Sequence, residues 1–343
     1  MANWELLKEL SETPGIPGNE DRIRDIVLRE TKDYIDNYEI DPLGNLIIHA
    51  GGNGPRLLLD AHMDEVGFMI SKIERKGFLR VIPVGGIPPE NVYSQRVIIW
   101  GKEPVYGIFG STPPHVRKGE KSDHPEIEEL FIDTGLKEKE VRSLINLGDA
   151  VTFDTRAVEQ SDVILGKAFD DRVGLFVMIE SLKRARKRSV DLYLVAAVQE
   201  ETGLRGATPA AFGVEPQMAI ALEGTVALDT LGVPDFKKLA EVGKGPEIRL
   251  SDRLFVASKK WVEFISELAN LRGIKHQVIV KRVGATDAAV IQISRKGVFT
   301  TAISVPVRYI HSANSLLLKD DVEETIKLVT ALIEEGGRFL DRV

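Results

Sequence analysis

Acidic and histidine side chains gather where an apolar stretch of the chain ends. The segment PRLLLDAHMDEVGF, residues 55–68, places three leucines shortly before Asp60, His62, Asp64 and Glu65. A short apolar run of this kind predicts a buried strand, so these side chains are expected at the end of a strand. Solvated charges and ligands of a bound ion are both compatible with that position.

The same combination recurs elsewhere in the chain. In open α/β sheets, ligands bind in the crevice beyond the carboxyl ends of the strands, so side chains that follow apolar strands are expected to meet there. The further positions are Glu200 and Glu201 after LYLVAAVQ, Glu223 after MAIAL, His311 after AISVPVRYI, and Asp170 with Asp171 before a helical stretch.

These residue types suit a metal site that activates water. The chain has no cysteine, so any metal must be held by nitrogen and oxygen donors, which favours Zn, Co or Mn. Glu200 and Glu201 leave their strand in different directions, so one can bind metal while the other faces a water molecule. A metal lowers the pKa of its water from about 15.7 towards 7, and a free carboxylate then accepts the proton. The pattern therefore indicates hydrolysis.

Each feature also has a purely structural interpretation. Neighbouring glutamates are usually solvated, and acids before a helix interact favourably with its dipole. Single histidines more often form structural hydrogen bonds than metal bonds. Paired carboxylates also serve glycoside hydrolysis, although that chemistry needs no imidazole ligand. The spacing alone leaves a metal site and separate structural roles open.

Alternating helices and strands must position these side chains. This alternation predicts an α/β fold with a mixed, mostly parallel, helix-covered sheet. The expected helices cover residues 4–10, 21–35, 172–186, 258–273 and 318–337, and the expected strands cover 45–50, 56–62, 190–198, 218–222, 275–280 and 297–305.

Residues 67–158 have a different character. Short strand-like segments such as RVIIWG, VYGIFG and DAVTFDT follow one another closely between glycines and prolines. This pattern predicts a small all-β, barrel-like domain inserted into a catalytic domain of residues 1–66 and 159–343. Its long loop STPPHVRKGEKSDHP carries His115 and His124, which are expected to be exposed rather than ligating.

Composition narrows the class of protein. Of 343 residues, 43% are hydrophobic and 28% are charged, as in a globular domain. No apolar run approaches the roughly 18 residues of a membrane helix, and the N-terminus lacks the pattern of a signal peptide. A cytoplasmic location without membrane association is expected. The net charge of −7 and the lack of a basic stripe argue against nucleic acid as a partner.

Five ordered motifs carry a family resemblance. AHMDEVGF, AFDDRVG, VQEETGLRGA, GATDAAVI and SVPVRYIHS resemble the M42 family of dinuclear metallo-aminopeptidases, which includes the tetrahedral (TET) enzymes. The likeness covers nearly the whole chain. It implies a zinc-peptidase-like sheet and two divalent ions per subunit, with Zn or Co favoured and Mn as a further candidate. It also implies removal of N-terminal residues from short peptides.

The resemblance assigns roles to individual residues. Asp170 resembles the carboxylate that bridges the two metals, and the family has a cis peptide bond after it. Glu200 resembles the general base. The remaining roles are His62 as a ligand of one metal, Asp64 as the carboxylate that orients it, and Glu201 with His311 as ligands of the second metal. Asp60 and Glu65 are left as local charges at the strand end.

Two positions depart from the family pattern. Glu223 stands where the family usually has aspartate, and the longer side chain puts metal affinity and metal preference in question. Fewer glycines precede Thr286 and Asp287, which lie in a segment near the substrate pocket of the family and are expected to bind substrate.

The resemblance also implies assembly. Family members form dimers through the β insertion, and six dimers close into a hollow dodecamer that admits short peptides. Two alternatives remain. One is a di-metal deacylase acting on N-acyl amino acids, and the other, suggested by Glu223, is a catalytically impaired binding or scaffold shell.

Overall fold

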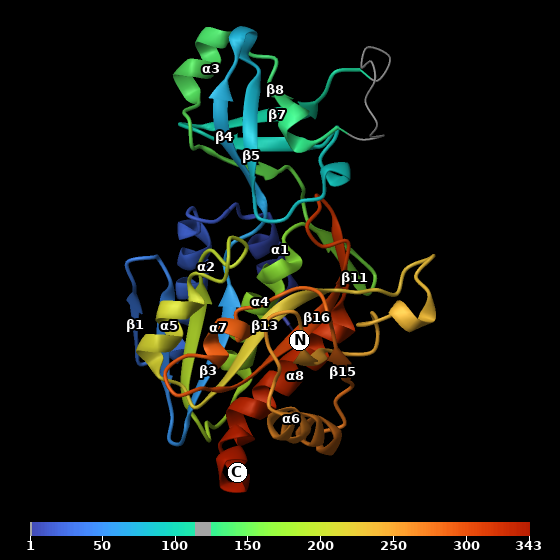
Figure 1. Cartoon of the computed structure of the whole chain (residues 1–343). Helices are drawn as coiled ribbons and strands as arrows, with labels where there is room; N and C mark the ends of the chain where they lie inside the picture. The colour runs from blue at the N-terminus through green and yellow to red at the C-terminus, as the bar shows by residue number, and fades with distance from the viewer. Residues whose placement is uncertain (1, 114–124) are drawn as a thin grey trace.

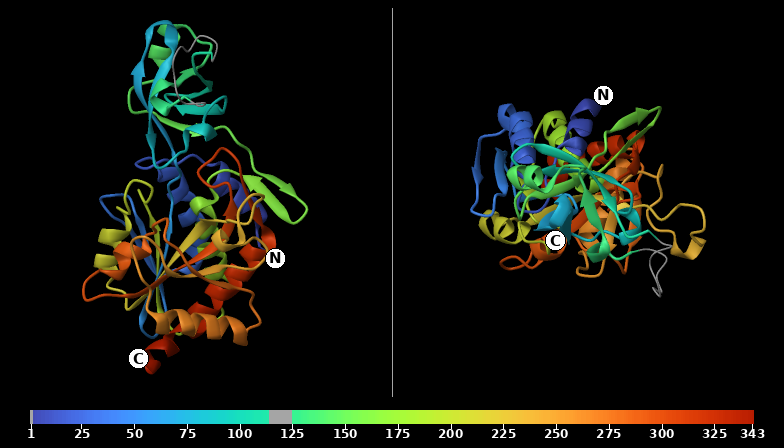
Figure 2. Two further views of the ribbon diagram at one scale, coloured as in Figure 1. Left: turned by 45° about the vertical axis from the view of Figure 1, so that its right-hand side comes forward. Right: turned by 90° about the horizontal axis from the view of Figure 1, so that it is seen from above.

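The computed structural model describes residues 2–113 and 125–343 and consists of two bodies (Figure 1). A helix-covered sheet forms the larger body, and a small β-barrel stands above it in the view of Figure 1. The left view of Figure 2 shows the same arrangement from another side, and in the right view, from above, the barrel lies in front of the larger body. His115 and His124 of the predicted loop lie outside the described residues.

The centre of the large sheet is parallel, as predicted. Four neighbouring strands run in the same direction, in the order β12 (Asp191–Ala197), β3 (Arg56–His62), β13 (Met218–Val226) and β16 (Phe299–Arg308). Because helices cover both faces, these strands are apolar on both sides and their sequences do not alternate. Their carboxyl ends therefore share one edge of the sheet.

The other strands extend this sheet to both sides. The path continues through antiparallel neighbours, while β14 and β15 form a side branch next to β16. These strands are β1 (Asn37–Ile40), β2 (Leu46–Gly51), β10 (Val158–Gln160), β11 (Val163–Gly166), β14 (Glu247–Ser251), β15 (Gln277–Val280) and β17 (Ser315–Leu318).

Helices cover the two faces unequally. On β3, Leu57 and Leu59 point into the larger core, whereas Leu58 points to the opposite face. The larger core packs beneath α1 (Trp4–Glu12), α2 (Asp21–Thr31), α4 (Phe169–Arg184), α6 (Lys259–Leu271) and α8 (Lys319–Glu335), and the opposite face packs beneath α5 (Ala207–Val214) and α7 (Ala288–Gln292).

The barrel is inserted directly after β3 and has its own core. Phe68 is completely buried, with its ring centroid 4.7 Å from that of Phe109 and 5.8 Å from that of Phe153. The closed order is β4 (Gly67–Ile73), β5 (Leu79–Val84), β8 (Phe131–Asp133), β7 (Pro104–Gly110), β6 (Arg96–Trp100) and β9 (Ala150–Phe153), with α3 (Glu138–Leu144) packed beside it.

Several elements differ from the sequence prediction. The strands β1, β10, β11, β14 and β17 and the helices α3, α5 and α7 were not predicted. Every residue of β1 is exposed, and the helices are short, so neither has a strong apolar period. The helix expected over 21–35 ends at Thr31, and the strand expected to end at residue 222 continues to Val226.

In residues 2–113 and 125–343, none of the helices is both long enough and apolar enough to cross a membrane.

The barrel core yields a stability prediction. We expect Phe68→Ala to lower the free energy of unfolding by about 3–5 kcal/mol, because it leaves a cavity between two aromatic rings. Lys72→Ala on the same strand is the control; its side chain is 64% exposed, and we expect a change within about 0.5–1 kcal/mol. Chemical denaturation of both variants tests this, and equal effects would contradict the described core.

Candidate metal centre and active site

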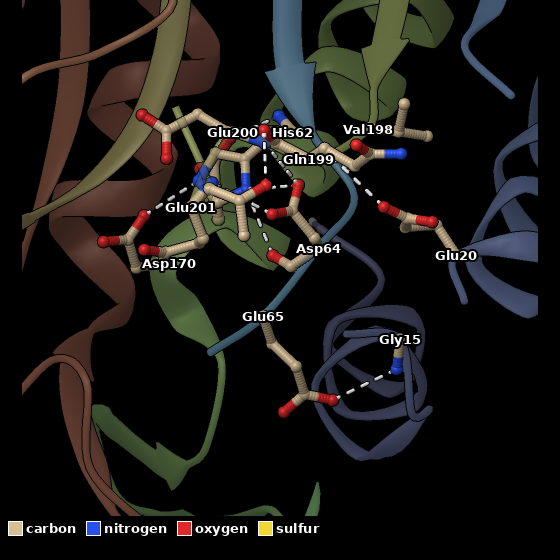
Figure 3. A network of polar contacts seen from close by, with 12 residues as sticks. Gly15, Glu20, His62, Asp64, Glu65, Asp170, Val198, Gln199, Glu200 and Glu201 are labelled. Atoms are coloured by element: carbon tan, nitrogen blue, oxygen red, sulfur yellow. Dashed lines mark hydrogen bonds and ion pairs between the residues drawn. The ribbon is translucent and has the colours of Figure 1, made fainter. Parts of the chain in front are cut away.

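The predicted acidic and histidine residues converge at the carboxyl edge of the central strands (Figure 3). Parallel neighbours β3 and β12 end in register, with His62 opposite Ala197, so the residues after each strand reach a common space. The residues brought together are His62 at the end of β3, Asp170 at the start of α4, Glu200 and Glu201 after β12, Glu223 within β13, and His311 after β16.

Asp170 lies between two imidazole rings. Its Oδ1 is 3.2 Å from His62 Nε2, and its Oδ2 is 3.3 Å from His311 Nε2. The other nitrogen of each ring faces a carbonyl, since His62 Nδ1 lies 3.1 Å from the Asp64 oxygen and His311 Nδ1 lies 2.7 Å from the Gly86 oxygen. A carbonyl only accepts hydrogen bonds, so each Nδ1 carries a proton. In a neutral ring, each Nε2 then turns its lone pair towards a carboxylate, an arrangement that requires a proton or a cation between them.

The surrounding carboxylates complete groups of metal donors. Glu201 Oε1 is 3.2 Å from His311 Nε2, and Glu223 Oε2 is 3.9 Å from His62 Nε2. Three sets of donors have all their atoms within 4.8 Å of one another, namely Asp170–Glu201–His311, His62–Asp171–Glu223 and His62–Glu200–Glu201. Imidazole nitrogens and carboxylate oxygens suit Zn, Co or Mn, so the donor set fits a metal. The longer side chain of Glu223 does reach the cluster.

Asp64 fixes the position of the loop that follows β12. Its two carboxylate oxygens accept hydrogen bonds from the backbone N–H groups of Glu200 and Glu201, each at 3.0 Å, and its Oδ1 lies 3.4 Å from His62 Nδ1. One buried carboxylate thus orients both a ring and the two glutamates. The Asp170–Asp171 peptide bond is cis, as the resemblance implies.

The cluster carries more negative charge than its own groups neutralise. Burial raises the pKa of Glu200 well above its usual value, and the charges of Asp287, Glu201 and Asp170 raise it further, against the opposing effect of His62. Burial alone would lower the pKa of His62, but the carboxylates around it outweigh burial and raise that pKa well above its usual value. Both shifts indicate a site that recruits positive charge.

Comparisons with known proteins identify the family of the chain. The sequence profile described as M42 glutamyl aminopeptidase matches residues 44–328. The chain belongs to the M42 aminopeptidase family. The chain is therefore a peptide hydrolase. The M42 peptidases are metallopeptidases, and the donor groups described above are of the types that bind metal ions.

Individual M42 relatives are similar over nearly their full lengths. A lysyl aminopeptidase of Pyrococcus furiosus is 37% identical over 98% of both chains. The aminopeptidase APDkam598 of Desulfurococcus kamchatkensis superimposes with a TM-score of 0.95 at 37% identity, over 99% of this chain and 96% of that one. The TET1 peptidase of Pyrococcus horikoshii, which can assemble into a tetrahedron or a large octahedral shell, gives a TM-score of 0.86 at 34% identity, over 97% and 99% of the two chains.

Asp60 and Glu65, left by the sequence as local charges at the strand end, are both buried in this M42 chain. Glu65 is buried and receives Lys167 Nζ on both oxygens, at 2.7 and 2.6 Å. Asp60 is buried, and burial raises its pKa to about 7. The position of Asp60 directly after the three leucines indicates that it is buried, because that strand is covered on both faces.

The two predicted substrate-binding residues have different surroundings. Thr286 lines the cavity beside the metal donors, and its buried hydroxyl has no hydrogen-bond partner among the described residues. Asp287 is buried next to Asp60, whose charge raises its pKa in addition to the effect of burial. Thr286 therefore lies at the cavity, whereas Asp287 is not among the described residues that line it.

Glu20 is a site-supporting residue that sequence reasoning missed. It precedes α2, and its Oε1 accepts the backbone N–H of Gln199 at 3.2 Å and that of Gly18 at 2.9 Å (Figure 3). It thus holds the residue before Glu200 from the opposite side to Asp64. No local sequence signal reveals a contact across 179 residues.

Glu20 yields a prediction on pH and stability. Burial raises its pKa from 4.5 to about 7, so the folded protein binds more protons than the unfolded chain between these values and loses stability as pH rises. Glu20→Gln keeps the accepting oxygen without the charge. In metal-depleted protein, we expect the variant to match wild type near about pH 4 and to be more stable above about pH 7, by up to about 3 kcal/mol. Denaturant midpoints test this, and a difference independent of pH would contradict it.

Proposed function

We propose that this protein is a metal-dependent aminopeptidase that removes N-terminal residues from short peptides. The observation that carries the proposal is the placement of Asp170 between His62 Nε2 and His311 Nε2, with both Nδ1 atoms engaged by carbonyls. That arrangement leaves two lone pairs and a shared carboxylate facing a common space. Two divalent cations satisfy it with the donors present.

Each ion has a set of donors from this chain. Asp170 is the shared carboxylate, His62 and Glu223 serve one ion, and Glu201 and His311 serve the other. Zn or Co fits these donors best, and Mn is a further candidate. Bound ions of this kind polarise a peptide carbonyl and lower the pKa of a coordinated water molecule.

Glu200 is the proposed general base. It belongs to the donor set of His62, Glu200 and Glu201, but the assignment above satisfies both ions without it, and Asp64 fixes its backbone. Its carboxylate accepts a proton from the attacking water and then donates it to the leaving amine of the cleaved peptide. Burial raises the pKa of Glu200 above its usual value, which makes this carboxylate a better proton acceptor than an exposed glutamate.

The charge of the cluster favours a substrate with a free amino terminus. Asp170, Glu200, Glu201 and Glu223 all line the cavity, so a protonated α-amine is attracted to it. An N-acyl amino acid has no such charge. We therefore place aminopeptidase activity ahead of deacylation.

The first functional prediction concerns Glu200→Gln. We expect kcat to fall by about 10² to 10⁴, the usual contribution of a general base, while the metal content measured by elemental analysis stays at the wild-type level. Glu39→Gln, on the exposed strand β1, is the matched control and is expected to retain full activity.

The substrates are aminoacyl p-nitroanilides, followed by the release of p-nitroaniline, and N-acetyl amino acids, followed by the release of acetate, each assayed with Zn, Co and Mn. Full activity in Glu200→Gln would contradict the role of the base. Preferential release of acetate from the N-acetyl amino acids would favour the deacylase instead. A protein that binds no metal and gains no activity on adding Zn or Co would be a binding or scaffold shell.

We further propose that the barrel is a dimerisation domain and that dimers build a dodecamer. The TET1 relative supports this by forming closed shells. The barrel also has exposed apolar side chains, including Tyr106 and Ile108 on one face of β7, which are 64% and 50% exposed. A surface of this kind is typical of an interaction site.

Light scattering tests the assembly. With a chain mass of 38.0 kDa, twelve copies give about 0.45 MDa. We expect this mass for wild type and a smaller species for Tyr106→Arg combined with Ile108→Arg, because charges oppose burial of the face. Tyr38→Arg, an exposed position on β1, is the control and is expected to leave the mass unchanged. A monomeric wild type would contradict the proposal.

A further inference from the structure

The cavity beside the metal donors has a second, oppositely charged wall. It encloses about 390 Å³ and is lined by the carboxylates of the metal centre and also by Arg249, Lys281 and Arg253. Neither the M42 assignment nor the relatives decide what side chain enters this space, since one relative is a lysyl aminopeptidase and the family description names a glutamyl one.

The cations lie close to the metal donors because the strands place them there. Thr225 follows Glu223 by two residues on β13, so it lies on the same face about 7 Å further along. Lys281 Nζ donates to Thr225 Oγ1 at 2.5 Å, and Arg249 Nη2 donates to the same oxygen at 3.2 Å. Arg249 Nη2 also lies 3.3 Å from Ser304 Oγ, and Ser304 is the strand partner of Glu223.

The carboxylates that pair with these cations do not face the cavity. Glu247 is fully buried, 2.7 Å from Arg249 Nε and 2.6 Å from Lys281 Nζ, and Asp252 is 3.2 Å from Arg249 Nη1. Arg249 and Lys281 line the cavity. Glu247 and Asp252 are not among the described residues that line it. Arg253 is exposed and forms no ion pair with any described residue. The wall therefore presents positive charge to a ligand.

We infer that this wall is the pocket for the side chain of the peptide's first residue and that it selects an acidic one, glutamate or aspartate. The inference rests on the proposed aminopeptidase function. With the α-amine among the carboxylates, the first side chain has the opposite wall of the same cavity to fill. Lys281 and Arg253 pair with its carboxylate, and Leu254 and Val283 contact its methylenes.

Glutamyl and glutaminyl p-nitroanilides provide the test, because they differ in charge and hardly in shape. We expect the metal-loaded enzyme to cleave the glutamyl compound with a kcat/KM about 10 to 100 times higher, the usual effect of a hydrogen bond to a charged group. The lysyl compound is expected to be the poorest of the three.

Variants assign the preference to the cationic wall. Lys281→Met combined with Glu247→Gln removes a buried cation together with its partner, and Arg253→Gln alters only an exposed position. We expect each to lower the ratio of glutamyl to glutaminyl kcat/KM, the first at least about tenfold, and Lys296→Met at the far end of the sheet to leave it unchanged. As a second readout, L-glutamate is expected to bind the wild-type enzyme more tightly than L-glutamine in calorimetry.

The possible results distinguish a failure of this inference from a failure of the proposed aminopeptidase function. Turnover of several free-amine substrates without a glutamyl preference would contradict a pocket selective for acidic side chains. The proposed aminopeptidase function would remain supported. A strong preference for dipeptides over p-nitroanilides, whatever the first residue, would assign the cations to the peptide's C-terminal carboxylate and also contradict the selective pocket. Absence of turnover with any free-amine substrate would overturn both.

Discussion

A buried excess of carboxylates around Asp170 is the constraint on which the rest of the site depends. Burial and mutual repulsion raise the pKa values of Glu200 and Glu223, while His62 and His311 are drawn towards their charged forms. Such a cluster is costly unless cations complete it, because isolated charges are poorly solvated inside a protein. The donor types, the tautomers and the proposed hydrolysis all follow from this need for positive charge.

The surrounding structure holds the charged groups in place with further buried polar contacts. Asp64 and Glu20 bind successive backbone N–H groups of the loop after β12, and Glu65 pairs with Lys167 shortly before Asp170. The buried guanidinium of Arg172 donates to the carbonyl of Leu10 in α1 and to that of Thr13 directly after this helix. These contacts connect elements far apart in sequence, so the geometry of the site depends on the packing of the whole α/β body.

The barrel contributes to the site as well as carrying an exposed apolar face. Gly86, which follows β5, accepts the hydrogen bond from His311 Nδ1–H and thereby directs the other nitrogen of the ring to Asp170. A change in how the barrel sits on the sheet would therefore reach the metal donors directly. This contact gives a physical link between the proposed assembly surface and the chemistry.

The sequence by itself determined the α/β class, the inserted barrel and the residues that converge, because apolar runs specify buried strands and parallel strands end at one edge. It did not reveal that Glu65 pairs with Lys167, and it gave no sign of Glu20 or of the wall formed by Arg249 and Lys281. Local charge says nothing about whether a side chain is buried, and these contacts join segments from separate parts of the chain. Only the tertiary structure decided which charges face the cavity and which stand behind it, since that depends on packing and not on residue type.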